Sequence, residues 1–127
     1  NHMRGNTMSK KFTKLSKDES KGVKTFYLPK VRSGSRPEVT LLVKKSGDVF
    51  EYGVAVCNEK DNFSRLVGRR LAFTRLVYKP LQAASAMQLQ SQLANYLRNL
   101  GKRRPSILEK VSMTELHNLA DIGKYFE

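Results

Sequence analysis

Residues 39–57 decide the fold, and they read VTLLVKKSGDVFEYGVAVC. Two runs rich in β-branched and aromatic residues, 39–45 and 49–57, flank the short turn Ser46-Gly47-Asp48, a pattern that predicts an antiparallel hairpin. Side chains alternate between the two faces of a strand, and one face of the second run is strongly apolar. We expect that face to line the core. Its members are Phe50, Tyr52, Val54 and Val56.

Two segments precede the hairpin. Residues 24–31 contain Phe26 and Tyr27, but Pro29 cannot donate to a strand ladder, so we expect a short edge strand or an extended entry to the sheet. Residues 1–23 open on Asn1-His2-Met3, which is typical of a tag remnant, and continue with closely spaced lysines and few apolar residues. Such a segment buries too little surface to offset its ordering entropy. We therefore divide the chain into a tag remnant with a mobile basic arm, 1–23, and a single domain, 24–127.

Three helices are predicted after the hairpin. Residues 61–78 form the first, which Pro80 ends. Residues 83–100 carry apolar side chains three and four positions apart, including Leu89 and Leu93, and Gly101 follows as a C-terminal cap. A last helix covers about 113–126. The fold class is therefore α+β: a small antiparallel sheet of two to three strands, packed by one helix, with two further C-terminal helices.

Composition restricts the function. The 127 residues include 24 Lys and Arg against 11 Asp and Glu, a net charge of +13. No apolar run reaches the roughly 18 residues that span a bilayer, and the single Cys57 cannot form an internal disulfide. These facts argue against a membrane protein and a disulfide-stapled scaffold, and they favour a reducing compartment such as the cytoplasm. The charge is uneven, because residues 1–36 carry a net +8 and residues 61–81 a net +4.

The 61–78 helix has two different sides. A helical wheel gathers the apolar residues into one stripe, which we expect to face the core. The stripe contains Phe63, Leu66, Val67, Leu71, Phe73, Val77 and Tyr78. On the opposite side Arg65, Arg69 and Arg75 frame the small residues Gly68 and Ala72. These two residues either let a nucleic acid approach the helix closely while the arginines hold its phosphates, or they form a packing contact with another helix.

Arg70 falls inside the apolar stripe. A buried guanidinium group needs a partner, so we expect either a carboxylate such as Glu51, Glu59 or Asp61, or a side chain that extends to solvent. An arginine held by a carboxylate in a functional cleft is the alternative.

The distribution of charge predicts a non-enzymatic nucleic-acid-binding protein that contacts mainly phosphates, favouring a duplex over a single strand and DNA over RNA. In this interpretation Gly68 and Ala72 let the nucleic acid approach the helix closely. The predicted binding residues are Arg65, Arg69 and Arg75 in the helix, Lys102, Arg103 and Arg104 in the connector after Gly101, and Lys10, Lys11 and Lys14 in the arm.

Other chemistry has weaker support. The chain lacks phosphate-binding and dinucleotide-binding glycine motifs and a nucleophile elbow, and its carboxylates match no metal loop, so we expect no cofactor, metal or catalytic residue. A small nuclease or transferase is the remaining enzymatic alternative. The 83–100 helix has an amide-rich polar face, which suits a protein partner or a homodimer. The main alternative function is therefore an inhibitor or modulator that binds an acidic surface of a host protein.

One segment carries a resemblance. The spacing Cys57-x3-Asp61-x-Phe63-x-Arg65-x2-Gly68-Arg69-x2-Ala72-x2-Arg75 resembles a segment of small uncharacterised proteins of bacteriophages and related bacterial elements. It covers about 20 residues and contains no catalytic signature. The resemblance implies a phage-type accessory protein in the cytoplasm of a bacterial host, and it implies no reaction and no site residue.

Overall fold

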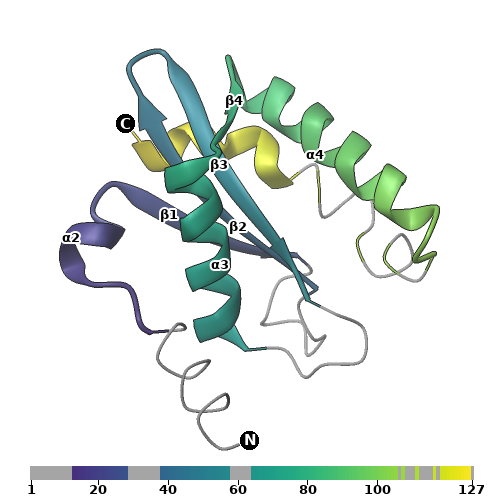
Figure 1. Ribbon diagram of the computed structural model, residues 1–127. Coiled ribbons are helices and arrows are strands. Elements are labelled where there is room, and N and C mark those ends of the chain that lie inside the picture. Colours follow the sequence, from purple (N-terminus) through teal and green to yellow (C-terminus); the bar gives the residue numbers. More distant parts are fainter. Residues whose placement is uncertain are drawn as a thin grey trace, which may run out of the picture.

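The computed structural model describes residues 13–28, 38–57, 64–105, 107, 111, 116 and 118–126. Figure 1 shows the order of its elements along the chain. They are α2 (Lys17–Ser20), β1 (Val23–Leu28), β2 (Val39–Ser46), β3 (Val49–Val56), α3 (Arg65–Tyr78), β4 (Leu81–Ala83), α4 (Ala86–Gly101) and the 3₁₀ helix η2 (Asn118–Phe126).

The four strands form one sheet in the order β1-β2-β3-β4, and each neighbouring pair is antiparallel. The predicted hairpin is confirmed as β2 and β3, and Gly47 supplies the positive φ of 62° that the turn requires. The α+β class is also confirmed, but the sheet has four strands instead of two to three. The additional strand is β4, whose last residue, Ala83, is the first residue of the predicted second helix. The three residues of β4 are too few to show an alternating pattern.

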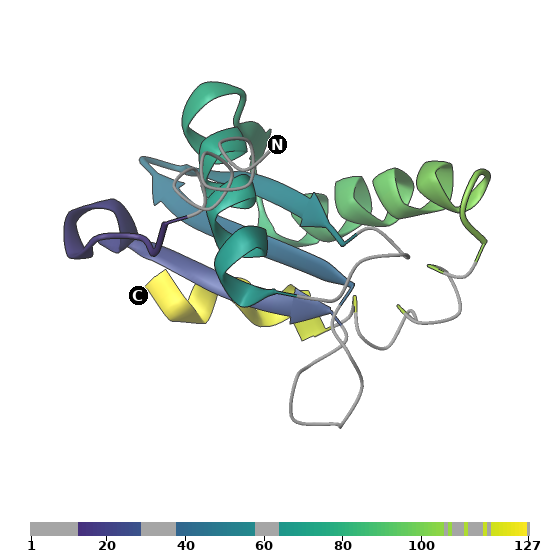
Figure 2. The ribbon, with the colours of Figure 1, turned by 60° about the horizontal axis from the view of Figure 1, so that its bottom comes forward.

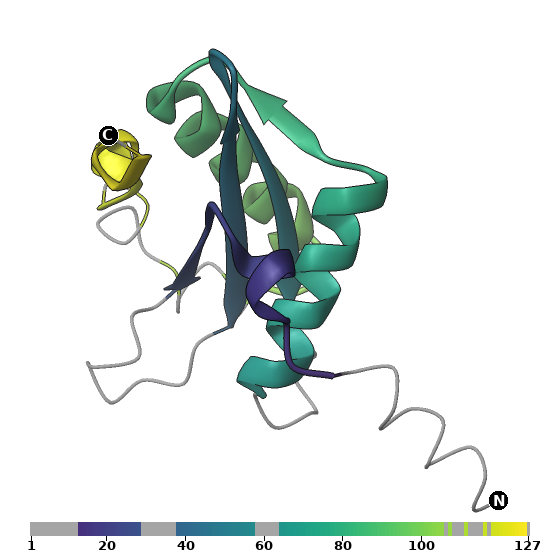
Figure 3. The same cartoon turned by 90° about the vertical axis from the view of Figure 1, so that its left-hand side faces the viewer.

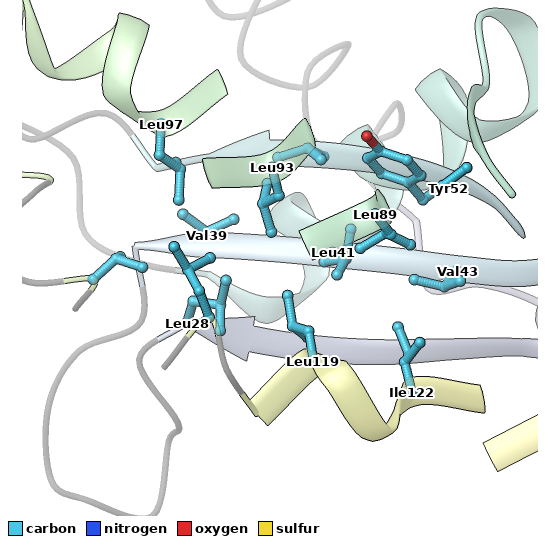
Figure 4. Close-up of a cluster of buried hydrophobic side chains, with 14 of the residues drawn as sticks. Leu28, Val39, Leu41, Val43, Tyr52, Leu89, Leu93, Leu97, Leu119 and Ile122 are labelled. Atoms are coloured by element: carbon cyan, nitrogen blue, oxygen red, sulfur yellow. The ribbon is translucent and has the colours of Figure 1, made fainter. Parts of the chain in front are cut away.

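Helices cover both faces of the sheet (Figures 2 and 3). α3 lies on one face, whereas α4 and η2 lie on the other. The larger hydrophobic cluster fills the space between the sheet and the α4–η2 layer, as Figure 4 shows. The smaller cluster lies beneath α3 and contains Leu42, Ala55, Ala72, Leu76 and Leu15.

The predicted core face of β3 is confirmed, because Phe50, Tyr52 and Val54 are buried in the larger cluster. This face packs on α4 and η2. The opposite face of β3 presents Gly53 and Ala55 to α3. A Cβ added at Gly53 would lie 2.7 Å from the backbone nitrogen of Leu76 and even closer to the carbonyl oxygen of Ala72. β3 therefore presents very little side-chain volume where α3 crosses it.

The orientation of α3 corrects our expectation. Ala72 and Leu76 are its buried residues, and a Cβ added at Gly68 would lie 2.5 Å from Oγ1 of Thr40 on β2. Gly68 and Ala72 thus face the sheet, and their predicted role as a close-approach surface for nucleic acid is wrong. They do form a packing contact, but with strands instead of another helix. The cause is the small side chains on both surfaces, which let the helix backbone approach the sheet.

The apolar stripe that we placed in the core is partly exposed as a result. Leu66, Val77 and Tyr78 are 43%, 50% and 78% exposed, whereas Leu71 and Phe73 pack at the border of the smaller cluster. Periodicity located the helix correctly but selected the wrong side, because the small residues that allow close packing contribute little to an apolar stripe.

The segment before β1 also differs from the prediction. Residues 13–22 were expected within a mobile arm, but they contain α2 and the buried Leu15, which joins the smaller cluster. Ser16 and Glu19 form a capping box: the Glu19 amide donates to Ser16 Oγ at 3.1 Å, and the Ser16 amide donates to Glu19 Oε1 at 2.9 Å. We call residues 13–22 the strap. Lys10 and Lys11 lie outside the described residues.

The C-terminal elements follow the prediction more closely. The apolar spacing of α4 is confirmed, since Leu89, Leu93 and Leu97 are buried in the larger cluster. Ser85 caps α4 by accepting a hydrogen bond from the Gln88 amide at 3.1 Å. Within the predicted last helix, residues 118–126 form the 3₁₀ helix η2. In the part of the chain that the structure describes, no helix has the length and apolar character needed to cross a membrane.

Candidate nucleic-acid interface

Arg65 and Arg69 lie on the side of α3 that faces β1. The Arg65 guanidinium carbon is 5.7 Å from the centroid of the Tyr27 ring, a cation–π contact with a residue of β1. Burial raises the pKa of the Tyr27 phenol, and the charges of Arg69 and Arg65 oppose that shift. Both arginines therefore lie close to the same phenol.

Arg75 lies on the other side of α3. Its Nη1 donates to the carbonyl oxygen of Val54 at 2.6 Å. β4 pairs only with residues 50–52 of β3, so Val54 lies on the stretch of the β3 edge beyond the end of β4. Arg75 therefore binds the edge of β3 beyond the end of β4. The three arginines of the predicted binding face do not share one side of the helix.

No carboxylate of the described residues pairs with Arg65 or Arg69. Neither arginine, nor Arg75, forms an ion pair with another described residue, and α3 itself contains no acidic residue. Nε of Arg69 is buried and has no hydrogen-bond acceptor among the described residues. The charge of these arginines is therefore not balanced by a carboxylate within the described part of the chain.

Arg70, next in sequence, is held by the strap. Its Nη1 and Nη2 donate to Oε2 and Oε1 of Glu19 at 2.9 and 3.0 Å, and its Nε donates to the carbonyl oxygen of Thr13 at 3.0 Å. Nη2 also donates to the carbonyl oxygen of Lys14 at 3.1 Å. The expected carboxylate partner exists, but it is Glu19 and not Glu51; Glu59 and Asp61 lie outside the described residues. The Ser16–Glu19 capping-box pattern was the sequence signal that could have revealed this ordered turn.

These contacts also place Lys14. The carbonyl oxygen of Lys14 accepts a hydrogen bond from Arg70, the neighbour of Arg69 in α3. The strap therefore places the Lys14 backbone beside α3. We call Lys14, Arg65 and Arg69 the basic flank.

Hydrogen bonds from Arg70 and from the Ser16 amide lower the pKa of Glu19 to about 2, so its carboxylate is ionised throughout the neutral range.

The connector after α4 divides into two parts. Arg104 is 12% exposed, and its Nη2 donates at 2.7 Å to Oε1 of Glu38, whose side chain is fully buried. Nη1 of Arg104 donates to the carbonyl oxygen of Cys57. The guanidinium group thus ties the connector to the sheet, which corrects its predicted role as a free phosphate ligand. Lys102 and Arg103 remain exposed.

The sheet register relates the two groups of cations. Tyr27, beside Arg65, pairs with Thr40 of β2. Thr40 lies two residues after Glu38, the carboxylate that binds Arg104 of the connector. Lys102 and Arg103 therefore approach the same end of the sheet as the basic flank, but from the opposite face. The predicted cations do not form a single helix face: Arg65, Lys102 and Arg103 lie toward one end of the sheet on its two faces, whereas Arg75 lies on the other side of α3.

The amide-rich face of α4 is partly used within the protein. The Tyr52 hydroxyl donates to Oε1 of Gln92 at 2.6 Å, and Arg98 donates to Oδ1 of Asn95 at 2.9 Å. Burial raises the pKa of Tyr52 to about 12. Within the described ranges, no group of three or more His, Cys, Asp or Glu side chains is arranged to hold a metal ion.

Comparisons with protein-family models, with curated proteins and with solved structures found no match to this chain.

Proposed function

We propose that the protein binds nucleic acid without an enzymatic step, mainly through phosphates at the basic flank. The observation that carries this proposal is the pair Arg65 and Arg69, which lie beside Tyr27 and have no carboxylate partner among the described residues. Guanidinium groups bind phosphate oxygens through paired N–H donors, and each neutralised phosphate releases a condensed counterion.

The contacts favour binding along the phosphate backbone. Because Gly68 and Ala72 face the sheet, α3 does not offer a small-residue surface that could enter a groove closely. The exposed Lys102 and Arg103, at the same end of the sheet, extend the contact surface around the sheet end. We retain Lys10 and Lys11 as further phosphate ligands on the basis of their charge.

The proposal favours a duplex, and DNA over RNA. Binders of single strands stack bases on exposed aromatic rings. At the basic flank the Tyr27 ring is already faced by Arg65, and the exposed Tyr78, Tyr96 and Tyr125 belong to the end of α3, to α4 and to η2. Backbone recognition of a duplex requires no such platform.

The test measures the affinity of a fluorescent duplex for the wild type and for the double variant Arg65→Gln/Arg69→Gln. Loss of two phosphate contacts should weaken binding by tenfold or more at low salt. The matched control is Lys45→Gln/Lys124→Gln, which removes the same charge from exposed positions away from Tyr27 and Thr40. Equal loss in both variants would show that only net charge matters and would contradict the assignment of the basic flank. Duplex RNA and single-stranded DNA in the same assay test the preference.

A second candidate function rests on the outward side of α3. Leu66, Val77 and Tyr78 are exposed there, on a helix with four arginines and no acid. We propose as the alternative that this face binds an acidic host protein. Capture from a bacterial lysate treated with nuclease separates the two functions: partners held through nucleic acid are lost, whereas one stoichiometric protein that is released by Tyr78→Ser supports the alternative.

The biological setting is also part of the proposal. The segment 57–75 suggests a phage-type accessory protein that acts in the bacterial cytoplasm, and the amide-rich face of α4 suggests a homodimer. Sedimentation of the protein with and without duplex DNA tests the dimer directly.

A further inference from the structure

The contact between Glu19 and Arg70 has the geometry of an anion complex. Two parallel N–H donors of the guanidinium group meet the two carboxylate oxygens at 2.9 and 3.0 Å. A phosphate group presents two oxygens to the same pair of donors in the same way. Arg70 is therefore already arranged to bind a phosphate, and Glu19 occupies the position that the phosphate would take.

The position of Arg70 relates this contact to the proposed function. Arg70 follows Arg69 directly in α3, and the strap backbone at Lys14 binds its guanidinium group. A nucleic acid on the basic flank would therefore bring phosphates close to the Glu19–Arg70 pair. The Glu19 side chain is 35% exposed and Arg70 is 15% exposed, so the carboxylate lies on the solvent side of the pair.

The strap has two separate attachments, which allows the carboxylate to leave without unfolding the protein. Leu15 is buried among residues of β2, β3 and α3, whereas α2 has no buried residue and lies beside α3 in Figures 1 and 3. Glu19 is thus held by its hydrogen bonds and not by packing. A competing anion has to replace those hydrogen bonds only.

On these grounds we propose that Glu19 is an intramolecular competitor for Arg70, which a bound phosphate displaces so that Arg70 becomes a further phosphate ligand of the basic flank. This inference rests on the proposed nucleic-acid binding. Because Glu19 has a pKa of about 2, protonation does not open the pair near neutral pH, and the competing anion itself is the trigger. Thr13 and Lys14 still accept hydrogen bonds from Arg70 after the exchange and keep it oriented.

The test compares two neighbouring carboxylates. Glu19→Gln and Asp18→Asn change the net charge equally, but the Asp18 carboxylate forms no ion pair with a described residue. We expect Glu19→Gln to bind a short DNA duplex at least about fivefold more tightly than Asp18→Asn. In an Arg70→Gln background the two changes should have equal effects. In the Glu19→Gln protein, Arg70→Gln should lower the slope of log affinity against log salt by about one.

Hydrogen exchange gives a second measurement. The Ser16 amide donates to Oε1 of Glu19 in the free protein, so displacement of the carboxylate by DNA should speed exchange at Ser16. Equal affinities of Glu19→Gln and Asp18→Asn, or unchanged or slower exchange at Ser16 in the DNA complex, would overturn the inference while leaving the proposed function intact. Failure of every variant to bind nucleic acid would remove the proposed function and this inference together.

Discussion

Gly53→Ala tests the contact on which the position of α3 depends. A Cβ at this site would lie 2.7 Å from the Leu76 nitrogen, closer still to the Ala72 oxygen, and both atoms belong to the helix backbone. Neither can rotate away, so the helix has to rise from the sheet. A gap of roughly 0.5–1 Å forfeits a quarter to a half of the dispersion attraction across it. Because overpacking typically costs about 1–3 kcal/mol, we expect the free energy of unfolding to fall by about 3 kcal/mol.

Urea denaturation followed by circular dichroism measures this change, and the melting temperature should fall by roughly 10 °C for a domain of this size. Gly123→Ala is the matched control, because a Cβ there meets only Phe50 Cζ, at 4.0 Å. We expect that variant to be as stable as the wild type or up to about 1 kcal/mol more stable. If the free energy of unfolding of Gly53→Ala lies within about 0.5 kcal/mol of the wild-type value, the close packing of α3 on β3 is refuted.

Three further predictions concern packing and ionisation. Gly68→Ala should lower the free energy of unfolding by about 1–3 kcal/mol because its Cβ meets Thr40 Oγ1, and Thr40→Ala should remove most of that loss. A double-mutant cycle measured in urea that gives no coupling energy would contradict the contact. Arg104→Leu should lower the free energy of unfolding by roughly 3 kcal/mol, since it removes the guanidinium group from the buried Glu38 carboxylate; a change confined to DNA affinity would show instead that Arg104 is a ligand. Tyr52 has its pKa raised by burial from 10 to about 12, so its stabilising contribution is complete below pH 10 and is lost as the pH rises toward 12. The stability difference between wild type and Tyr52→Phe should shrink over that interval in alkaline denaturation, and a constant difference would contradict the raised pKa.

The parts of the fold that the sequence predicted correctly are those in which one face is apolar and the other is not. The hairpin of β2 and β3 and the buried side of α4 have clear periods of two and of three to four residues. β4 was missed because three residues show no period. The orientation of α3 was predicted wrongly because Gly68 and Ala72 meet Thr40 and Gly53, and this fit between small residues exists only after the strand and the helix are placed together.

The candidate site was predictable in its residue types but not in its arrangement. The concentration of arginine in residues 65–75 is visible in the sequence, and so is the need for a carboxylate beside Arg70. The identity of that carboxylate, Glu19, depends on a contact between residues 51 positions apart. The separation of Arg75 from Arg65 and Arg69 depends on which side of α3 packs on the sheet, which the apolar pattern had misassigned.

The salt dependence of duplex binding tests the central claim most directly, namely that Arg65 and Arg69 of the basic flank bind phosphates. If about six phosphates are contacted, the affinity of the wild type should fall roughly a thousandfold between about 50 and 200 mM salt. Arg65→Gln/Arg69→Gln should lower the slope by about two. An affinity for duplex DNA that hardly changes over this range, or a slope that the two arginine substitutions leave unchanged, would contradict the account.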